Sequence, residues 1–249
     1  MEKETVRIAA IADIHVKKTG QGAFQPLFAK ATEDADVLLL CGDLTDYGLV
    51  EEAKILAKEI TSSLRIPVLG VLGNHDVESG HEQEIVQILT DAGVVMLDGD
   101  AHEVHGVGFA GVKGFGGGFG RRQLGAWGEK IIKAFVHEVI EEALKLEAAL
   151  ARLRTPQKIA VLHYAPIAAT VVPEPPEIMP FLGSSRLEEP VDRYRCTAVF
   201  HGHAHRGSAE GRTKGGVPVY NVAMPLLAAA NPDHPFRVVE VPIKESAVA

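Results

Sequence analysis

The sequence predicts an α/β fold, in which short buried strands alternate with amphipathic helices. Two observations lead to this class: β-branched runs of strand length recur along the chain, and apolar residues at helical spacing lie between the first of them. The chain has 249 residues, of which 46% are hydrophobic and 23% charged, so it can bury one sizeable core. No repeat and no linker-like stretch divides it, and we expect residues 1–249 to form one domain with layered sheets.

The predicted strands are short and apolar. The first three cover residues 6–12, 37–41 and 68–72, and their nearly continuous apolar composition is typical of strands buried on both faces. The later ones cover residues 158–162, 198–200, 217–222 and 237–241. The alternation of strand and helix at the start, followed by a second half richer in strands, favours mostly parallel sheets.

The predicted helices lie between these strands. Helical periodicity covers residues 24–33, 49–64, 82–92 and about 129–154. The last stretch has the clearest apolar stripe, which is formed by Ile132, Phe135, Val139, Ala143, Leu146, Leu150 and Leu153. We expect this stripe to face the core. Asp46 is predicted to cap the helix that begins near Leu49.

Charge and hydropathy exclude several classes of protein. Lys and Arg number 25 and Asp and Glu 33, so the formal net charge is −8 and no overall positive field favours long duplex nucleic acid. The longest apolar runs are far shorter than the roughly 18 residues of a membrane span. The charged start shows no secretory signal, so we expect a cytoplasmic protein that does not enter membranes.

Polar residues with metal-binding or acid–base chemistry follow the predicted strands at the points where these end. They are Asp13 and His15, Asp43, Asn74 with His75 and Asp76, His163, and His201 with His203 and His205. The carboxyl ends of parallel strands meet at one edge of a sheet, where ligands bind in open α/β folds. We therefore expect one site to gather these side chains.

The residue types and their spacing predict a pair of metal ions. A spacing of two in Asp13/His15 and in His203/His205 places both side chains of a pair on the same side of an extended segment. Imidazoles mixed with carboxylates suit manganese, iron, zinc or nickel rather than calcium. More ligands are available than one ion can use, and Asp43 on a Gly-Asp turn is the expected bridge between two divalent ions. The predicted metal ligands are Asp13, His15, Asp43, Asn74, His163, His203 and His205.

Two divalent ions would attract an anion into this acidic protein. A hydroxide that bridges the ions is the expected nucleophile for attack on phosphorus, and the ions would stabilise the charge that builds on the phosphate oxygens. His75 is the predicted general acid for the leaving alkoxide. Asp76 is predicted to orient the ring of His75 and to hold it protonated.

The polar residues form short motifs with their neighbours, and these motifs follow one another in a known order. The pattern D-x-H, G-D, G-N-H-[D/E], a single H and then G-H-x-H is present without departure between Asp13 and His205. In this respect the sequence resembles the calcineurin-like metallophosphoesterase superfamily. The resemblance implies one metal on Asp13, His15, Asp43 and His205, and a second on Asp43, Asn74, His163 and His203. It also implies that His75 is the catalytic acid, and that the fold is a four-layer α/β/β/α sandwich of two mixed sheets flanked by helices.

The predicted activity is metal-dependent phosphoester hydrolysis, with a small nucleotide-type phosphodiester as the favoured substrate. A phosphomonoesterase or a nuclease of the same family would use the same metals. A non-catalytic scaffold with this fold is the alternative from another class, although the ligands and the acid are all intact. A mononuclear hydrolase would bind one ion per chain instead of two.

Several features keep two interpretations open. The glycine-rich segment 111–120 is a lid that brings Arg121 or Arg122 to a phosphate, or only a surface loop. Arg206 has the same two interpretations. His201 either orients a ligand or simply ends a strand. The proline-rich segment 166–180 follows His163, so it is expected to run over the surface and to flank the entrance of the site.

Overall fold

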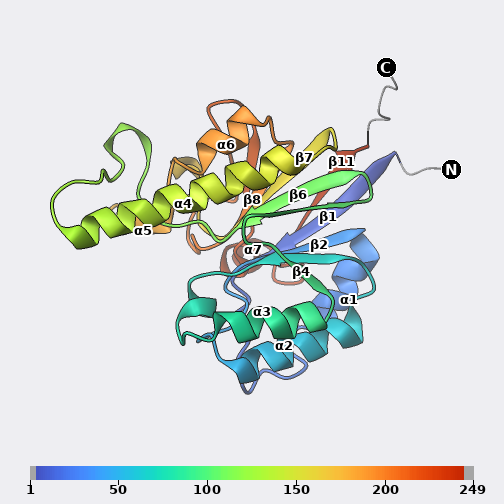
Figure 1. Cartoon of the computed structure of the whole chain (residues 1–249). Coiled ribbons are helices and arrows are strands. Elements are labelled where there is room, and N and C mark those ends of the chain that lie inside the picture. Colours follow the sequence, from blue (N-terminus) through green and yellow to red (C-terminus); the bar gives the residue numbers. More distant parts are fainter. Residues whose placement is uncertain (1–3, 244–249) are drawn as a thin grey trace.

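The computed structural model describes residues 4–243, which form two β-sheets packed face to face between two layers of helices (Figure 1). The first sheet has the strand order β11-β1-β2-β3-β4. It consists of β1 (Thr5–Ile11), β2 (Val37–Cys41), β3 (Val68–Val71), β4 (Val94–Met96) and β11 (Arg237–Pro242). The strands β1 to β4 are parallel, and β11 pairs antiparallel with β1.

The second sheet has the order β5-β6-β7-β8-β10-β9. It consists of β5 (Asp100–Val104), β6 (Val107–Val112), β7 (Gln157–Leu162), β8 (Ala198–His201), β9 (Glu210–Arg212) and β10 (Pro218–Asn221). The four central strands are parallel, and the edge strands β5 and β9 run antiparallel to their neighbours. Both sheets are therefore mixed, which confirms the predicted fold class.

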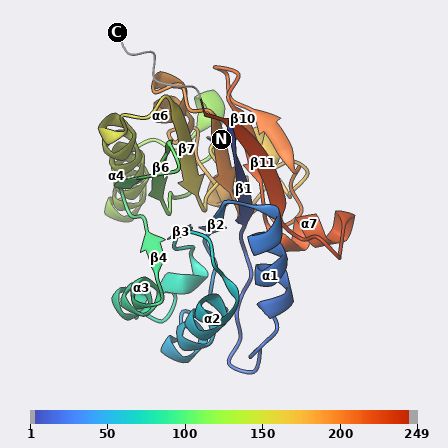
Figure 2. The ribbon, with the colours of Figure 1, turned by 90° about the vertical axis from the view of Figure 1, so that its right-hand side faces the viewer.

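Helices cover the outer face of each sheet (Figure 2). The first sheet carries α1 (Gln25–Asp34), α2 (Val50–Ser63) and α3 (Glu82–Asp91), and the second carries α4 (Lys130–Arg152) and α6 (Glu188–Arg193). The short helices are α5 (Met179–Leu182), α7 (Met224–Ala230) and the 3-10 turns η1 (His75–Val77), η2 (Gly120–Arg122) and η3 (Ala168–Thr170). None of the helices in the described part of the chain combines the length and the apolar character that a membrane crossing requires.

Successive side chains of a strand point to opposite faces of the sheet, and this alternation explains how the layers pack. In β2, Leu38 and Leu40 pack against the helices, while Leu39 and Cys41 enter the core between the two sheets. All of these side chains are fully buried. A strand that is covered on both faces needs apolar residues at every position, and each buried leucine contributes about 1.5–3 kcal/mol.

The predicted strands and long helices are present, with bounds shifted by two residues at most. The strands β4, β5, β6 and β9 were not predicted. The strand β6 contains two glycines, which are more typical of loops than of strands. A Cβ at Gly108 would lie 2.4 Å from Oγ1 of Thr155, and one at Gly111 would lie 2.8 Å from Cβ of Leu97. These glycines let neighbouring segments approach the sheet closely, so in this strand they indicate packing rather than a loop.

The start of α2 corrects one prediction. Oε2 of Glu52, a buried side chain, accepts the backbone N–H of Leu49 at 3.3 Å and that of Tyr47 at 2.9 Å. Glu52 thus reaches back to the start of the helix, and Leu49 rather than Asp46 stands at the N-cap. The carboxylate of Asp46 instead lies beside His15, with Oδ1 3.7 Å from Nδ1 of the ring.

The glycine-rich segment also differs from the prediction, because most of it is buried rather than on the surface. A Cβ at Gly116 would lie 2.7 Å from the carbonyl oxygen of Pro180, and one at Gly117 would lie 3.0 Å from Val139 of α4. The proline-rich segment is mixed: Thr170 and Val171 are buried, while residues 172–178 are mostly exposed. Close packing of the glycines argues against a freely moving lid.

Candidate metal centre

The parallel strands of both sheets end at one edge of the molecule, and the predicted ligands follow them there. From the first sheet come Asp13 and His15 after β1, Asp43 after β2 and Asn74 after β3; from the second come His163 after β7 and His203 with His205 after β8. Three overlapping groups of these side chains, with His75, have ligand atoms within 4.8 Å of one another. Residues that are up to 192 positions apart in sequence therefore meet in one place.

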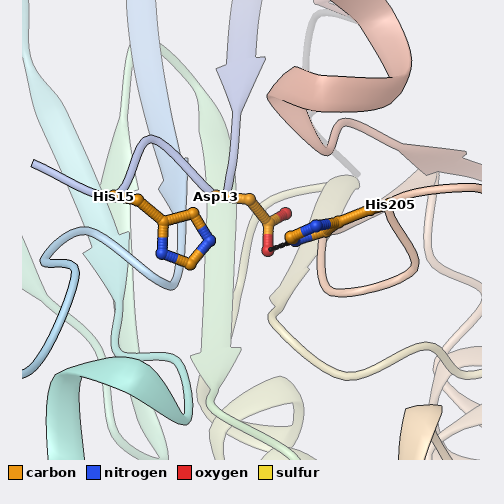
Figure 3. A group of neighbouring side chains, drawn as sticks. All are labelled: Asp13, His15 and His205. Atoms are coloured by element: carbon orange, nitrogen blue, oxygen red, sulfur yellow. Dashed lines mark hydrogen bonds and ion pairs between the residues drawn. The ribbon is translucent and has the colours of Figure 1, made fainter.

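The first group is centred on Asp13, whose side chain is fully buried. Its Oδ1 lies 3.0 Å from Nε2 of His205. The backbone N–H of His203 donates to Oδ2 at 3.0 Å, so the carboxylate is held by the loop that carries the two histidines. Figure 3 shows the rings of His15 and His205 on either side of the Asp13 carboxylate.

The second group is centred on His163, whose ring is buried. Nδ1 of His163 donates to the carbonyl oxygen of Cys41 at 3.0 Å, which directs Nε2 towards the other ligands. Nε2 lies 3.0 Å from Oδ1 of Asn74 and 3.3 Å from Oδ1 of Asp43. His203 completes the group, and its Nε2 donates to the carbonyl oxygen of Phe181 at 3.2 Å, which leaves Nδ1 as a possible ligand atom.

Asp43 connects the groups, because its carboxylate belongs to one with His163 and His203 and to another with His15 and His75. The backbone N–H of His75 donates to Oδ1 of Asp43 at 2.8 Å. Gly73 makes this position possible: a Cβ there would lie 2.1 Å from the same oxygen. The glycine before Asn74 is therefore needed to make room for the carboxylate that both groups share.

The backbone at this site is strained. Asp13, His15, Asp43 and His203 have φ values of 56°, 44°, 50° and 70°, in the left-handed region that residues other than glycine rarely adopt. Each such residue costs about 1–3 kcal/mol, and such strain clusters at functional sites. Four of the seven predicted ligands thus have a conformation that the surrounding structure must impose.

The donor set fits metal ions. Nδ1 and Nε2 of His15 are both buried, and neither has a hydrogen-bond partner among the described residues. At His163, two carboxyl or amide oxygens face a single ring nitrogen, an arrangement that needs a cation or a proton between them. Imidazole nitrogens together with carboxylate and amide oxygens suit the borderline divalent metals.

The electrostatics of the group also favour positive charge. Burial opposes the protonation of His163, but the Asp43 carboxylate outweighs it and raises the pKa of this histidine to about 9. Burial and the neighbouring His163 lower the pKa of His203 to about 3, and burial lowers the pKa of His15. The carboxylates thus attract one cation beside His163, while the imidazoles of His15 and His203 stay neutral, as metal ligands must. At His205, the hydrogen bond to the Asp13 carboxylate raises the pKa.

His75, the predicted acid, lies at the rim of these groups. Its side chain is 35% exposed and its ring meets that of His15 edge-on, with centroids 4.6 Å apart. Nδ1 of His75 lies 2.6 Å from the carbonyl oxygen of Asp46, to which it donates. Sequence reasoning missed this partner, because a backbone carbonyl carries no signal in the residue type.

Asp76 has a different place from the one predicted. Its carboxylate is fully buried and accepts the backbone N–H groups of Leu44, Thr45 and Gly73 at 2.8–3.1 Å. The hydroxyl of Thr45 donates to it as well, at 2.6 Å. Asp76 therefore ties the loop after β2 to the loop after β3, and the ring of His75 is oriented by the Asp46 carbonyl instead.

The arginines that were considered as phosphate ligands lie on the surface. Arg121 and Arg122 are exposed on η2, and Arg206 is exposed after the histidine loop. The backbone N–H of Arg206 donates to Oε1 of Glu174, at 2.7 Å, which joins the proline-rich segment to this loop. That contact places the segment beside the loop that carries the histidines.

One family model matches most of the chain. The model described as calcineurin-like phosphoesterase matches residues 6–207, which include every predicted ligand. No protein with a curated description is similar enough in sequence to be matched to the chain.

Several solved structures share the fold. Phosphopantetheinyl hydrolase (PptH) from Mycobacterium tuberculosis has 17% sequence identity and a TM-score of 0.66, over 93% of this chain and 95% of that one. TT1561 of Thermus thermophilus has 14% identity and a TM-score of 0.55, over 96% and 100%. A candidate 5′-nucleotidase from Staphylococcus aureus has 14% identity and a TM-score of 0.54, over 87% of this chain and 48% of that one. At these identities the likeness shows the fold.

Proposed function

Because this chain belongs to the calcineurin-like phosphoesterase family, we propose that it hydrolyses a small phosphodiester of the nucleotide type with two divalent metal ions. Metal-dependent hydrolysis of a phosphoester follows from the family, whereas the number of ions and the substrate are our proposal. One observation carries it: the carboxylate of Asp43 belongs to two ligand groups at once. A shared carboxylate is what a two-metal centre requires.

The resemblance to the family divides the proposed ligands into two sets. Asp13, His15, Asp43 and His205 would hold one ion, and Asp43, Asn74, His163 and His203 would hold the other. The donor types suit manganese, iron, zinc or nickel. When bound, the ions would supply an acidified water as nucleophile and would stabilise negative charge on the phosphate oxygens.

The protein side chains would orient the reaction and handle its proton. Nδ1 of His75 donates to the carbonyl of Asp46, so Nε2 is the nitrogen that can give a proton to a leaving alkoxide. Partial exposure of His75 lets the ring regain its proton from water after each turnover.

Two arguments support a small phosphoester with an alcohol as leaving group. A leaving alkoxide gains most from a positioned acid such as His75, since an alkoxide is a poor leaving group. Among the structural relatives, one name refers to a nucleotide and another to a phosphopantetheinyl group, which supports a small phosphoester as substrate. A monoester is the second candidate, and the nucleotidase name is the observation that favours it.

The test compares bis(p-nitrophenyl) phosphate with p-nitrophenyl phosphate on protein reloaded with manganese. We expect faster turnover of the diester, about two metal ions per chain by elemental analysis, and loss of both properties in Asp43→Asn. Asp91→Asn, an exposed substitution on α3, serves as the matched control. Preference for the monoester would overturn the diester assignment, and one ion per chain in the active protein would overturn the two-metal assignment.

A further inference from the structure

A buried amide lies behind the histidine loop. Asn221 ends β10 and is 1% exposed. Its Nδ2 donates to the carbonyl oxygens of Ala204, at 2.8 Å, and of Thr170, at 3.3 Å. Its Oδ1 accepts the backbone N–H of Ala223, at 3.2 Å. One side chain thus satisfies backbone groups of three separate segments, and both of its own polar atoms are paired.

The first of these segments carries two proposed metal ligands. Ala204 is fully buried between His203 and His205. Its carbonyl oxygen also accepts the N–H of Gly207, at 3.1 Å. The bond from Asn221 therefore fixes the peptide between Ala204 and His205, in the middle of the loop that carries both histidines.

The segment around Ala223 leads back to the first sheet. Ala223 forms a bridge with Ala12, and the backbone N–H of Met224 donates to the carbonyl of Ala12 at 2.9 Å. Ala12 directly precedes Asp13. Asn221 thus connects the loop of His203 and His205 with the segment that carries Asp13.

Thr170 and His201 extend the same cluster from the proline-rich segment. Both side chains are fully buried, and Oγ1 of Thr170 lies 2.7 Å from Nε2 of His201. Nδ1 of His201 donates to the carbonyl of Gly202 at 2.8 Å, so Nε2 accepts the hydroxyl of Thr170, which also lies 3.3 Å from the carbonyl oxygen of Ile167. His201 and Asn221 are partners in the register of β8 and β10.

Close packing shows that this cluster is built to a tight fit. A Cβ at Gly207 would lie 2.1 Å from the carbonyl oxygen of Thr170 and 3.0 Å from Nδ2 of Asn221. Only a residue without a side chain lets the loop approach the amide so closely.

We propose that Asn221, with Thr170 and His201 behind it, is a positioning residue that holds His203 and His205 in the geometry of metal ligands. The identity of these histidines as ligands rests on the proposed function. An asparagine is suited to this task because it offers two donors and one acceptor from one short side chain. An aspartate has the same shape, but it would replace the Nδ2 amide by an oxygen. That oxygen would face the carbonyl oxygens of Ala204 and Thr170, so that three acceptors would meet without a donor.

The test compares Asn221→Asp with Gln157→Glu. Gln157 is also a buried amide, 8% exposed, but it begins β7 at the opposite end of the sheet, where its Oε1 accepts the hydroxyl of Thr197. We expect Asn221→Asp to bind cobalt(II) about 10–100-fold more weakly and to change the visible spectrum of the bound ion. The control should bind within about twofold of the original protein. An Asn221→Asp variant with unchanged affinity and spectrum would overturn the proposal.

A second pair decides the matter if Asn221→Asp does not fold. Thr170→Val removes the hydroxyl that His201 accepts, whereas Thr170→Ser keeps it. In metal-free protein, we expect the amide protons of residues 202–207 to exchange on the order of tenfold faster in the valine variant than in the serine variant. Equal exchange in the two variants would contradict the positioning role.

The two readouts separate this inference from the proposed function. If the original protein binds no metal but the exchange of residues 202–207 responds to the hydroxyl, the loop is positioned as we propose and the two-metal function fails. If the original protein hydrolyses the diester with bound metal and the variants bind that metal equally well, the function stands and the positioning role fails.

Discussion

The carbonyl oxygen of Asp46 lies 2.6 Å from Nδ1 of His75. This hydrogen bond fixes the orientation of the His75 ring, which lies at the rim of the proposed metal centre and is not a proposed ligand. Asp46 follows the Gly-Asp turn of β2, and His75 follows β3. The orientation of the proposed acid therefore depends on how two neighbouring loops of the first sheet are held together.

His75→Ala should lower kcat by about 10²–10⁴-fold when the leaving group is an alkyl alcohol, because no positioned acid then protonates it. The loss should be much smaller with a p-nitrophenolate leaving group, which departs without a proton. Steady-state kinetics on the two kinds of diester would measure the difference. His137→Ala, on the exposed side of α4, is the control. An equal loss on both substrates would exclude the acid role.

Asp76→Ala should lower the free energy of unfolding by about 3–5 kcal/mol, because it leaves buried donors of Leu44, Thr45 and Gly73 without an acceptor. Chemical denaturation of the metal-free protein would measure this. Asp91→Ala, whose carboxylate is exposed and accepts only an amide of Gln87 in the described structure, should change it by less than about 0.5 kcal/mol. A small effect at Asp76 would contradict the loop-tying role.

Gly73→Ala should weaken metal binding by more than about tenfold, because the new methyl group would overlap Oδ1 of Asp43. Titration with manganese in competition with a chelator would measure the affinity. Gly125→Ala tests for a general effect of the substitution, since the nearest atom there is 3.3 Å away on an exposed tryptophan. Comparable affinities in the two variants would show that the shared carboxylate is not held as we describe.

Removal of the metal should lower the melting temperature. At a free metal concentration of 100 times Kd, binding stabilises the folded chain by about 2.7 kcal/mol, which corresponds to roughly 5–10 °C for a chain of this size. Thermal unfolding with manganese and with a chelator would show the shift. In Asp43→Asn the two curves should coincide, and a shift that survives in this variant would place the stabilising ion elsewhere.

The ligands were accessible to sequence reasoning because each follows a strand that is apolar on both faces. Such strands can be identified locally, and the edge at which they end then follows from their parallel order. The motif order added the assignment of ligands to two ions, which the residues alone left open. The strand β6 escaped prediction because Gly108 and Gly111, which are needed there for close packing, are also the residues typical of loops.

The partners of the ligands were harder to predict. Asp76 follows the proposed acid in sequence, so adjacency suggested that it orients the ring, but its side chain turns into the core towards Thr45. The atom that does orient His75 is a backbone carbonyl, and any residue type could supply it. Asn221 stands at a strand end like the ligands, but its contacts depend on three segments that only the folded chain brings together.

The proposed ligands come from both sheets: Asp13, His15, Asp43 and Asn74 follow strands of the first, and the three others follow strands of the second. Neither half of the sandwich holds a complete ligand set, so the centre can form only after the two sheets have docked. Bound ions would link the two sheets across their interface, and separation of the sheets would release the ions. Metal release would then measure the separation of the two sheets, even if each sheet kept its own strands and helices.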